Sequence, residues 1–399
     1  MKGFQIGRLF GIPIRLDLTF LLVLPLFAYV IGSQIGTWAV IFNDLVGASV
    51  DVSALTGAPA VAYTVGTATA VGLFASVLLH ELGHSLVARR YDVDIESITL
   101  WLFGGVAQLG EFPEDWRKEL YIAVAGPVVS VLLGVGLFVG FGFVPGGNTL
   151  LVAARFAVGY LALTNVALAA LNMLPGFPMD GGRVLRALLA RDRPYARATQ
   201  VAATVGKGFA ILLGLFALFG GAGINLYLVA LAFFIYIGAA SEAQQTMMRA
   251  AFEGVQVRDI MTPAEDVKTV DAGASVADLL ERMFAERHTG YPVTRNGEVV
   301  GLVTLEDAQG VRAVERDAYA VEEVMSTDLQ TIEPGADAMD AMERMQEAGV
   351  GRLLVMDGDD LAGLISRTDL MTALNIIRET GSVSPRSRPA ESPERRPDF

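Results

Sequence analysis

The segment Leu79-His80-Glu81-Leu82-Gly83-His84 lies inside an apolar run that extends from about residue 62 to residue 87. Positions i and i+4 share one face of an α-helix, so the two histidines can reach a single metal ion. Glu81 lies beside them, and H-E-x-x-H is the arrangement of a zinc site with an adjacent general base. Because ionisable residues are costly inside an apolar span, they usually serve a function there. The segment therefore predicts a zinc site within a membrane helix.

The composition divides the chain of 399 residues into two parts. Residues 1–245 carry 14 basic and 14 acidic residues, whereas residues 246–399 carry 16 basic and 29 acidic ones, so the net charge of −13 lies entirely in the second part. With 53% hydrophobic residues overall, the pattern predicts a membrane domain followed by an acidic soluble part. Nucleic-acid binding is not expected, because a basic surface is missing. The absence of cysteine excludes disulfides and thiolate ligands.

Six apolar stretches are long enough to cross a bilayer as helices. We expect these spans at about 18–37, 62–88, 119–143, 150–173, 201–220 and 223–240. Only Gly220-Gly221-Ala222-Gly223 separates the last two, so a single kinked or re-entrant element is the alternative there. Lys and Arg precede the first span and fill the second and fourth connections, while the loops at 38–61, 144–149 and 221–222 contain none. This bias predicts a cell-membrane protein with both termini in the cytoplasm.

A second polar segment follows the fourth span and reads Asn172-Met173-Leu174-Pro175-Gly176-Phe177-Pro178-Met179-Asp180-Gly181-Gly182. Pro175 and Pro178 remove backbone donors and should end the helix. In the predicted topology, Asp180 lies at the same cytoplasmic depth as the two histidines. A carboxylate there would complete a His₂Asp set and leave a fourth position open, as in catalytic zinc sites.

Together, the His80–His84 motif and the Asn172–Gly182 segment resemble the site-2 protease family of intramembrane zinc metalloproteases. The resemblance covers essentially residues 1–240, and Gly11-Ile12-Pro13-Ile14-Arg15-Leu16 and Phe103-Gly104-Gly105 also match the family pattern. It implies one zinc ion per chain.

The family roles fall on named positions of this chain. The resemblance implies that His80, His84 and Asp180 bind zinc, that Glu81 is the general base, and that Asn172 contacts the substrate or the oxyanion. Asn165 lies on roughly the same helix face as Asn172 and is a second candidate for that role; an interhelical hydrogen bond is the alternative.

The segment Ser97–Val106, which contains Gly104 and Gly105, is predicted to form a short membrane-associated hairpin. Its edge could pair with an extended substrate strand, because a helix must unwind before its peptide bonds can be cleaved. Simple packing beside the motif helix is the alternative.

The soluble part contains an internal repeat with an offset of 62 residues. Asp278–Met283 recurs as Asp340–Met345, and Gly301–Asp307 recurs as Gly363–Asp369. Each unit reads as a helix, two short strands and a helix. The repeat resembles a tandem CBS domain pair, which we place at about 255–312 and 320–376 within a cytoplasmic domain over 246–380. Residues 381–399 are rich in Ser, Pro and Arg and are predicted to be disordered.

The CBS resemblance implies an adenine nucleotide and a homodimer. In that family, the positions matching Thr304, Asp307, Ser366 and Asp369 often contact the ribose. A hydroxyl and a carboxylate at a helix start suit ribose hydroxyls. The same residues are also good helix N-caps, and many CBS pairs bind nothing, so a purely structural role is the alternative.

The predicted fold is thus a polytopic α-helical membrane protein, with about six transmembrane helices and a short β-hairpin, joined to an α/β tandem CBS domain. The predicted function is that of a zinc-dependent intramembrane endopeptidase, which cleaves transmembrane or membrane-associated proteins near the cytoplasmic face and is regulated through its CBS domains. The alternatives are a CBS-gated transporter or channel and a catalytically silent membrane adaptor.

Overall fold

The computed structural model describes residues 3–101, 104–109, 115–220, 223–358 and 360–380. It divides into two compact units, Met1–Thr246 and Met247–Phe399, and each is described by itself. The tail that is predicted to be disordered, residues 381–399, lies outside the described residues.

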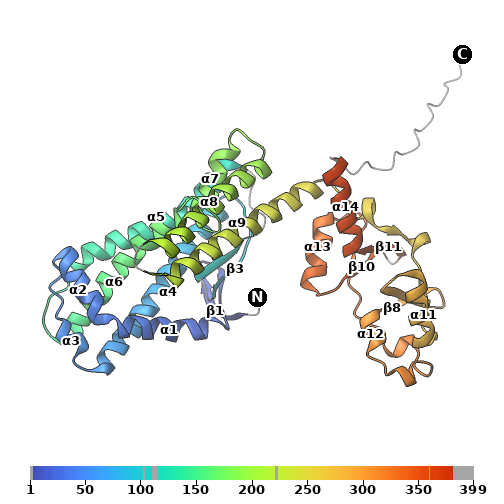
Figure 1. Ribbon diagram of the computed structural model, residues 1–399, viewed down its shortest axis with the longest axis horizontal. Helices are drawn as coiled ribbons and strands as arrows, with labels where there is room; N and C mark the ends of the chain where they lie inside the picture. The colour runs from blue at the N-terminus through green and yellow to red at the C-terminus, as the bar shows by residue number, and fades with distance from the viewer. Residues whose placement is uncertain (1–2, 102–103, 110–114, 221–222, 359, 381–399) are drawn as a thin grey trace, which may run out of the picture. The chain divides into compact units, whose positions relative to one another are not determined.

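The first unit is mainly helical (Figure 1). Its helices are α1 (Phe20–Ser33), α2 (Ile35–Val46), α3 (Val52–Thr56), α4 (Pro59–Arg89), α5 (Trp116–Phe141), α6 (Thr149–Asn172), α7 (Asp180–Ala190), α8 (Tyr195–Phe219) and α9 (Leu226–Phe252). Among the described residues, α4, α5, α6, α8 and α9 are each long and apolar enough to cross a membrane, and α1 with α2 would make a sixth, broken span. The prediction of a polytopic helical membrane protein is confirmed.

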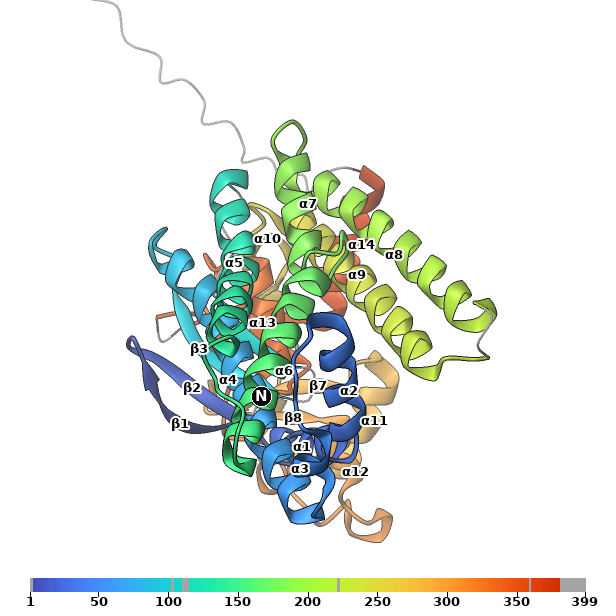
Figure 2. The ribbon, with the colours of Figure 1, turned by 90° about the vertical axis from the view of Figure 1, so that its left-hand side faces the viewer.

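Two details of the predicted spans differ from the structure. The first span is bent by 59° after Ser33, and the helix α2 then occupies residues that were expected to form a loop. The reason is packing: Ile35, Ala39 and Phe42 of α2 are buried in one apolar core with Phe156 of α6. At the other end, α8 and α9 are two separate helices that run side by side (Figures 1 and 2), and α9 extends to Phe252, well past residue 240.

A four-stranded sheet packs beside α4. Its strands are β1 (Gly3–Leu9), β2 (Ile12–Asp17), β3 (Ile95–Trp101) and β4 (Gly104–Leu109), in the order β1-β2-β3-β4. The expected hairpin corresponds to β3 and β4, which pair antiparallel, whereas β1 and β2 were not predicted as strands. Alternate residues of β2, Ile12 and Ile14, are buried against Leu82 of α4. Because β4 pairs only with β3, its other edge has no strand partner among the described residues.

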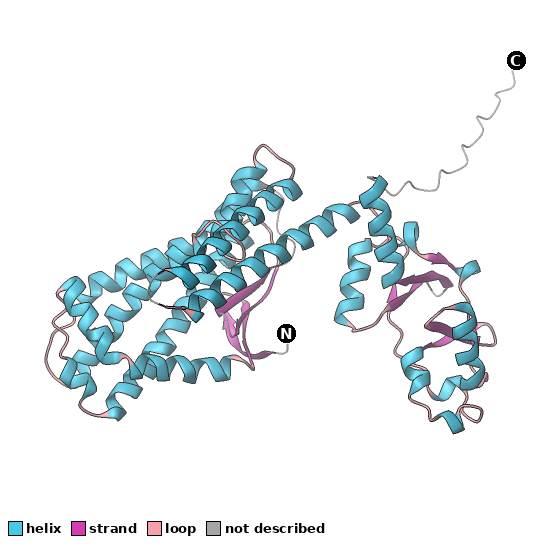
Figure 3. Cartoon of the chain, in the orientation of Figure 1, coloured by secondary structure: helices cyan, strands magenta, loops and turns pink. Residues whose placement is uncertain are grey.

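The second unit contains two similar halves, in which helices cover small sheets (Figure 3). Its main elements are α10 (Val257–Ile260), β5 (Thr262–Pro263), β6 (Val270–Asp271), α11 (Val276–Glu286), β7 (Gly290–Arg295), β8 (Glu298–Thr304), α12 (Leu305–Gln309), β9 (Thr331–Ile332), α13 (Ala338–Glu347), β10 (Arg352–Asp357), β11 (Asp360–Ser366) and α14 (Arg367–Thr380). Strands β7 and β8 recur as β10 and β11 at the 62-residue offset seen in the sequence.

The two halves interlock through their leading segments. The sheet orders are β6-β7-β8 and β5-β11-β10-β9, so β5, which lies near the start of the first repeat, completes the sheet of the second. Ser326, near the start of the second repeat, forms a bridge with Leu302 in the first sheet. Each half has its own apolar core, one around Leu279 and Val293 and the other around Leu353 and Val355.

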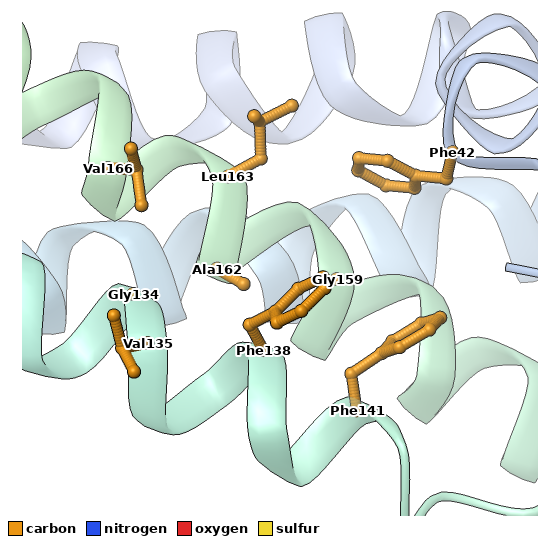
Figure 4. Close-up of a pocket in the computed structure, with 9 residues that line it drawn as sticks. All are labelled: Phe42, Gly134, Val135, Phe138, Phe141, Gly159, Ala162, Leu163 and Val166. Carbon is orange, nitrogen blue, oxygen red and sulfur yellow. The ribbon is translucent and has the colours of Figure 1, made fainter. Parts of the chain in front are cut away.

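The first unit also has an apolar cavity of about 300 Å³ between α5 and α6 (Figure 4). Phe138 and Phe141 of α5, Leu163 of α6 and Phe42 of α2 are among its lining residues, and none of the lining residues carries a polar side chain. The apolar lining of this cavity offers no group for acid, base or metal chemistry. A site for such chemistry must therefore lie elsewhere in the unit.

Candidate metal centre

Three potential metal ligands converge inside the first unit. His80 and His84 lie on one face of α4, and Asp180 is the first residue of α7. Asp180 Oδ2 lies 3.1 Å from His80 Nε2 and 3.2 Å from His84 Nε2, and the two Nε2 atoms are 3.2 Å apart. All three residues are buried. Among the described residues, no other group of three His or carboxylate side chains has this arrangement.

Asp180 reaches the histidines because the chain folds back tightly after α6. That helix ends at Asn172, and α7 begins against the preceding turn with Gly181 and Gly182. A Cβ atom at Gly181 would lie 2.2 Å from Leu174 O, and one at Gly182 would lie 2.5 Å from Phe177 N. Both distances are impossible for a real side chain. The two glycines therefore allow the approach that brings the start of α7 to α4.

Helix α5 orients the imidazoles. His80 Nδ1 lies 2.9 Å from Ser130 Oγ, and His84 Nδ1 lies 2.7 Å from Ile122 O. Since a carbonyl can only accept, His84 carries its proton on Nδ1, which leaves Nε2 free to bind a metal. The sequence patterns did not single out Ser130, which looks like an ordinary residue of an apolar span.

The geometry of the three ligand atoms fits zinc. Tetrahedral zinc with ligands at 2.0–2.2 Å requires ligand atoms about 3.3–3.6 Å apart, slightly more than the 3.1–3.2 Å found here. Space for the ion exists because residue 126 of α5 is glycine: a Cβ atom there would lie 2.2 Å from His84 Nε2 and 2.7 Å from His80 Nε2. Ile122, Gly126 and Ser130 are spaced by four residues, so they share the face of α5 that lies against the histidines.

A carboxylate and an amide flank this group. Glu81 follows His80 on α4, and the backbone of β4 passes close to it: a Cβ atom at Gly105 would lie 2.5 Å from Glu81 Cγ. The side chain of Asn172 is near the ligands as well, with Nδ2 3.5 Å from His80 Nε2. The structure thus brings Asn172 to the three-ligand group and Gly105 to Glu81, while their roles in catalysis stay predictions.

Comparison with known proteins identifies the family. A model of peptidase family M50 matches residues 68–155 and 147–213, and a model of the CBS domain matches residues 257–311 and 321–376. A zinc metalloprotease of Methanocaldococcus jannaschii is 33% identical over 385 residues, which are 94% of this chain and 96% of that protein. The chain belongs to peptidase family M50.

Solved structures give two further likenesses. The site-2 protease from Methanocaldococcus jannaschii is 34% identical, covering 61% of this M50 chain and 95% of that chain, with a TM-score of 0.39. CBSX2 in complex with AMP is 26% identical, covering 31% of this chain and 98% of that one, with a TM-score of 0.28. The predictions of a site-2 protease type metalloendopeptidase and of a tandem CBS pair are confirmed by the family matches and the close relative.

Asn165 stands apart from the metal centre of this M50 protein. Its Nδ2 donates to Ser76 Oγ at 3.0 Å and to Leu161 O at 2.8 Å, so it connects α6 to α4 through an interhelical hydrogen bond. That contact is the structural alternative considered for it. No contact between Asn165 and the histidines or Asp180 is found among the described residues.

In the CBS pair, the four predicted nucleotide contacts form two matching helix caps. Thr304 donates to Asp307 Oδ2 through both its backbone N and its Oγ1, each at 2.7 Å. Ser366 and Asp369 repeat this at 2.8 and 2.7 Å. One oxygen of each carboxylate is thereby engaged at a helix start.

A basic residue that the sequence patterns did not single out joins the two CBS repeats. Arg352, at the start of β10, donates from Nη2 to Thr289 Oγ1 at 2.9 Å. Burial lowers the pKa of the Arg352 guanidinium, while the nearby carboxylate of Asp369 acts in the opposite direction. In the first repeat the equivalent position is Gly290, and the guanidinium occupies the space that a side chain there would need.

Proposed function

We propose that this M50 metalloprotease holds one zinc ion at His80, His84 and Asp180 and cleaves a peptide bond of a membrane protein near the cytoplasmic face. The observation that carries the proposal is the convergence of the three ligand atoms, within 3.2 Å of one another, beside Glu81 on a helix of membrane-spanning length. The chain supplies the ligand set of a hydrolytic zinc site and a carboxylate at the adjacent position.

Glu81 is the general base in this proposal. Zinc, when bound, lowers the pKa of a coordinated water to about 7 and polarises a carbonyl. Glu81 takes a proton from the attacking water while the water oxygen bonds to the carbonyl carbon. Glu81 then returns that proton to the amine nitrogen when the C–N bond breaks. In this proposal the amide of Asn172, whose Nδ2 lies 3.5 Å from His80 Nε2, donates a hydrogen bond to the oxyanion.

The free edge of β4 is the proposed binding place for the substrate. A peptide bond within a helix is shielded by its own hydrogen bonds, so the substrate has to be extended where it is cut. An added strand along β4 would satisfy the backbone groups of both partners. Because Gly105 of β4 lies directly beside Glu81, this strand would run past the catalytic carboxylate.

The placement near the cytoplasmic face rests on the distribution of charge. Arg89 and Arg90 follow the motif at the end of α4, and the connections rich in Lys and Arg alternate with connections that have none. By the positive-inside rule, the metal centre and both termini lie on the cytoplasmic side.

Regulation by an adenine nucleotide is proposed for the CBS pair. Each repeat presents a hydroxyl and a carboxylate at a helix start, at Thr304 and Asp307 and at Ser366 and Asp369, which suit ribose hydroxyls. Arg352 adds a half-buried guanidinium between the repeats, and guanidinium groups bind phosphate well. A homodimer through the CBS pair is the form in which we expect the protein to work.

Cleavage of a transmembrane substrate by the full chain in proteoliposomes tests the proposal. Glu81→Gln should lose at least about 100-fold in cleavage rate and keep its zinc, whereas Asp180→Asn should lose both. Glu96→Gln and Asp192→Asn change exposed carboxylates and serve as matched controls. Undiminished cleavage by Glu81→Gln would refute the general base, and zinc content at the wild-type level in Asp180→Asn would refute the ligand assignment. Mass spectrometry of the products locates the cut relative to the membrane.

A further inference from the structure

A buried cluster of charges lies behind the metal centre. Arg186 of α7 is 2% exposed and bonds to carboxylates on two other helices. Its Nη2 lies 2.6 Å from Glu119 Oε1 of α5, and its Nη1 lies 2.5 Å from Glu242 Oε1 of α9. Glu119 is completely buried, and its second oxygen has no hydrogen-bond partner among the described residues. The mechanism proposed above uses none of these three residues.

Aromatic rings complete the surroundings of Arg186. Its guanidinium carbon lies 4.9 Å from the ring centre of Phe177 and 4.8 Å from that of Tyr195, which begins α8. A buried ion pair of this kind rarely adds net stability, because desolvation offsets the attraction. In some proteins such pairs instead specify a single arrangement of the elements that carry them. Here the elements fixed are α5, α7, α8, α9 and the turn that contains Phe177.

Only a short stretch of chain separates the cluster from Asp180, a proposed zinc ligand. Arg186 follows Asp180 by six residues on the same short helix, and Phe177 precedes Asp180 by three. A metal site requires its ligand atoms to lie within about 0.2 Å of their ideal distances. Any movement of α7 that the cluster permits is therefore transmitted to Asp180, because nothing flexible separates the two residues.

Helix α9 touches the same region a second time. A Cβ atom at Gly238 would lie 2.7 Å from Pro178 Cδ, so the backbone of α9 packs directly on the turn before Asp180. One helical turn later, Glu242 reaches Arg186. The far end of α9 belongs to the CBS unit, where Phe252 is completely buried in the apolar core. The helix that packs on the Asp180 turn therefore continues along the chain into the second unit.

We propose that Arg186 and Glu242 are positioning residues that hold Asp180 in the metal-binding position, and that α9 conveys the state of the CBS pair to the zinc site through them. The inference rests on the proposed function, since it takes Asp180 as a zinc ligand. It assigns a role in metal affinity to two residues that do not touch the metal, the substrate or Glu81.

Zinc affinity, measured on the purified full chain by competition with a chelating dye, tests the positioning role without any cleavage assay. Arg186→Met and Glu242→Ala should each raise the free zinc concentration at half-saturation by about 10-fold, the scale found for groups that orient metal ligands. Arg186→Lys keeps the charge and should restore part of the affinity. Glu253→Ala, which removes an exposed carboxylate beyond α9, is the matched control and should change nothing.

A second pair of variants tests the backbone contact. Gly238→Ala forces the Pro178 turn away and should also weaken zinc binding, whereas Gly208→Ala on α8 adds a methyl group in open space and should not. If Glu242→Ala and Gly238→Ala both keep wild-type zinc affinity while their thermal midpoints fall, the cluster is only structural and the proposal is wrong. Glu242→Ala and Gly238→Ala change residues at or near the surface of the cluster, so both are expected to fold. They keep the test decisive even if Arg186→Met fails to fold.

The proposed route from the CBS pair through α9 has a separate test. ATP or AMP should shift the zinc half-saturation of the wild type and leave that of Glu242→Ala unchanged. An equal shift in both proteins, or none in the wild type, would refute the route through α9. Wild-type protein that binds zinc but cleaves no substrate would instead refute the proposed function and leave the positioning role intact.

Discussion

Replacement of Gly126 by alanine should abolish zinc binding although it alters no ligand. The methyl carbon of Gly126→Ala would lie 2.2 Å from His84 Nε2 and 2.7 Å from His80 Nε2. It would occupy the space between the nitrogens, where the proposed site would hold the ion. To restore an ordinary contact of 3.4 Å, His84 or α5 would have to move by about 1.2 Å, the difference between the two distances.

That displacement is several times larger than a zinc site tolerates, since ligand distances have to stay within about 0.2 Å. We therefore expect zinc affinity to fall by more than about 100-fold, or about 2.8 kcal/mol at 1.4 kcal/mol for each factor of ten. Cleavage should disappear with the metal. An alanine in a helix is itself about 0.8–1 kcal/mol more favourable than glycine, so a general loss of helix stability is not the expected cause.

The assay is metal content by mass spectrometry together with chelator competition on the purified full chain. Gly136→Ala is the matched control, because residue 136 is on the same helix and nothing lies within 4 Å of a Cβ atom there. It should keep one zinc ion per chain at wild-type affinity. One zinc ion at wild-type affinity in Gly126→Ala would show that the ion does not sit between the two imidazoles, and it would refute the geometry inferred for the site.

Three further changes test the surroundings of the site and the CBS pair. Gly105→Ala should press on Glu81 and lower kcat about 10-fold or more with zinc retained, while Gly7→Ala in open space leaves kcat unchanged; equal kcat values would contradict the close approach of β4. Ser130→Ala removes the group that orients one imidazole and should weaken zinc binding about 10-fold, as chelator competition would show. Arg352→Gln should weaken ATP binding in calorimetry by at least about 10-fold, and unchanged binding would exclude a phosphate contact there.

The parts of the fold that depend on local pattern could be predicted from the sequence. The apolar spans, the end of α6 before Pro175 and the 62-residue repeat all follow from spacing and composition. The bend after Ser33 could not, because α2 is held by tertiary contacts of Phe42 with α6. The strands β1 and β2 also depend on distant pairing: β2 lies parallel to β3, with Ile14 opposite Ile98.

The site shows the same division. The spacing of His80 and His84 reveals a shared helix face, since i and i+4 are neighbours on any helix. The contribution of Asp180 was predicted from its depth in the topology and from the family pattern, whereas the physical reason for its position, the close backbone contacts of Gly181 and Gly182, appears only in three dimensions. Ser130 carries no local signal at all, because only the packing of α5 on α4 turns its hydroxyl toward an imidazole.

The metal centre is best understood as a match of register between two helices. On α4 the ligands are four residues apart, and on α5 the groups that serve them are also four apart: Ile122 O and Ser130 Oγ orient one imidazole each, and Gly126 between them leaves the space for an ion. A shift of α5 by one residue would turn this face away by about 100° and remove all three contributions together. The identity of the ligands alone is therefore not sufficient for the site, which also requires the packing of the apolar helix α5 against α4. For this reason a methyl group at position 126 of α5 should reduce zinc binding as much as the loss of a histidine.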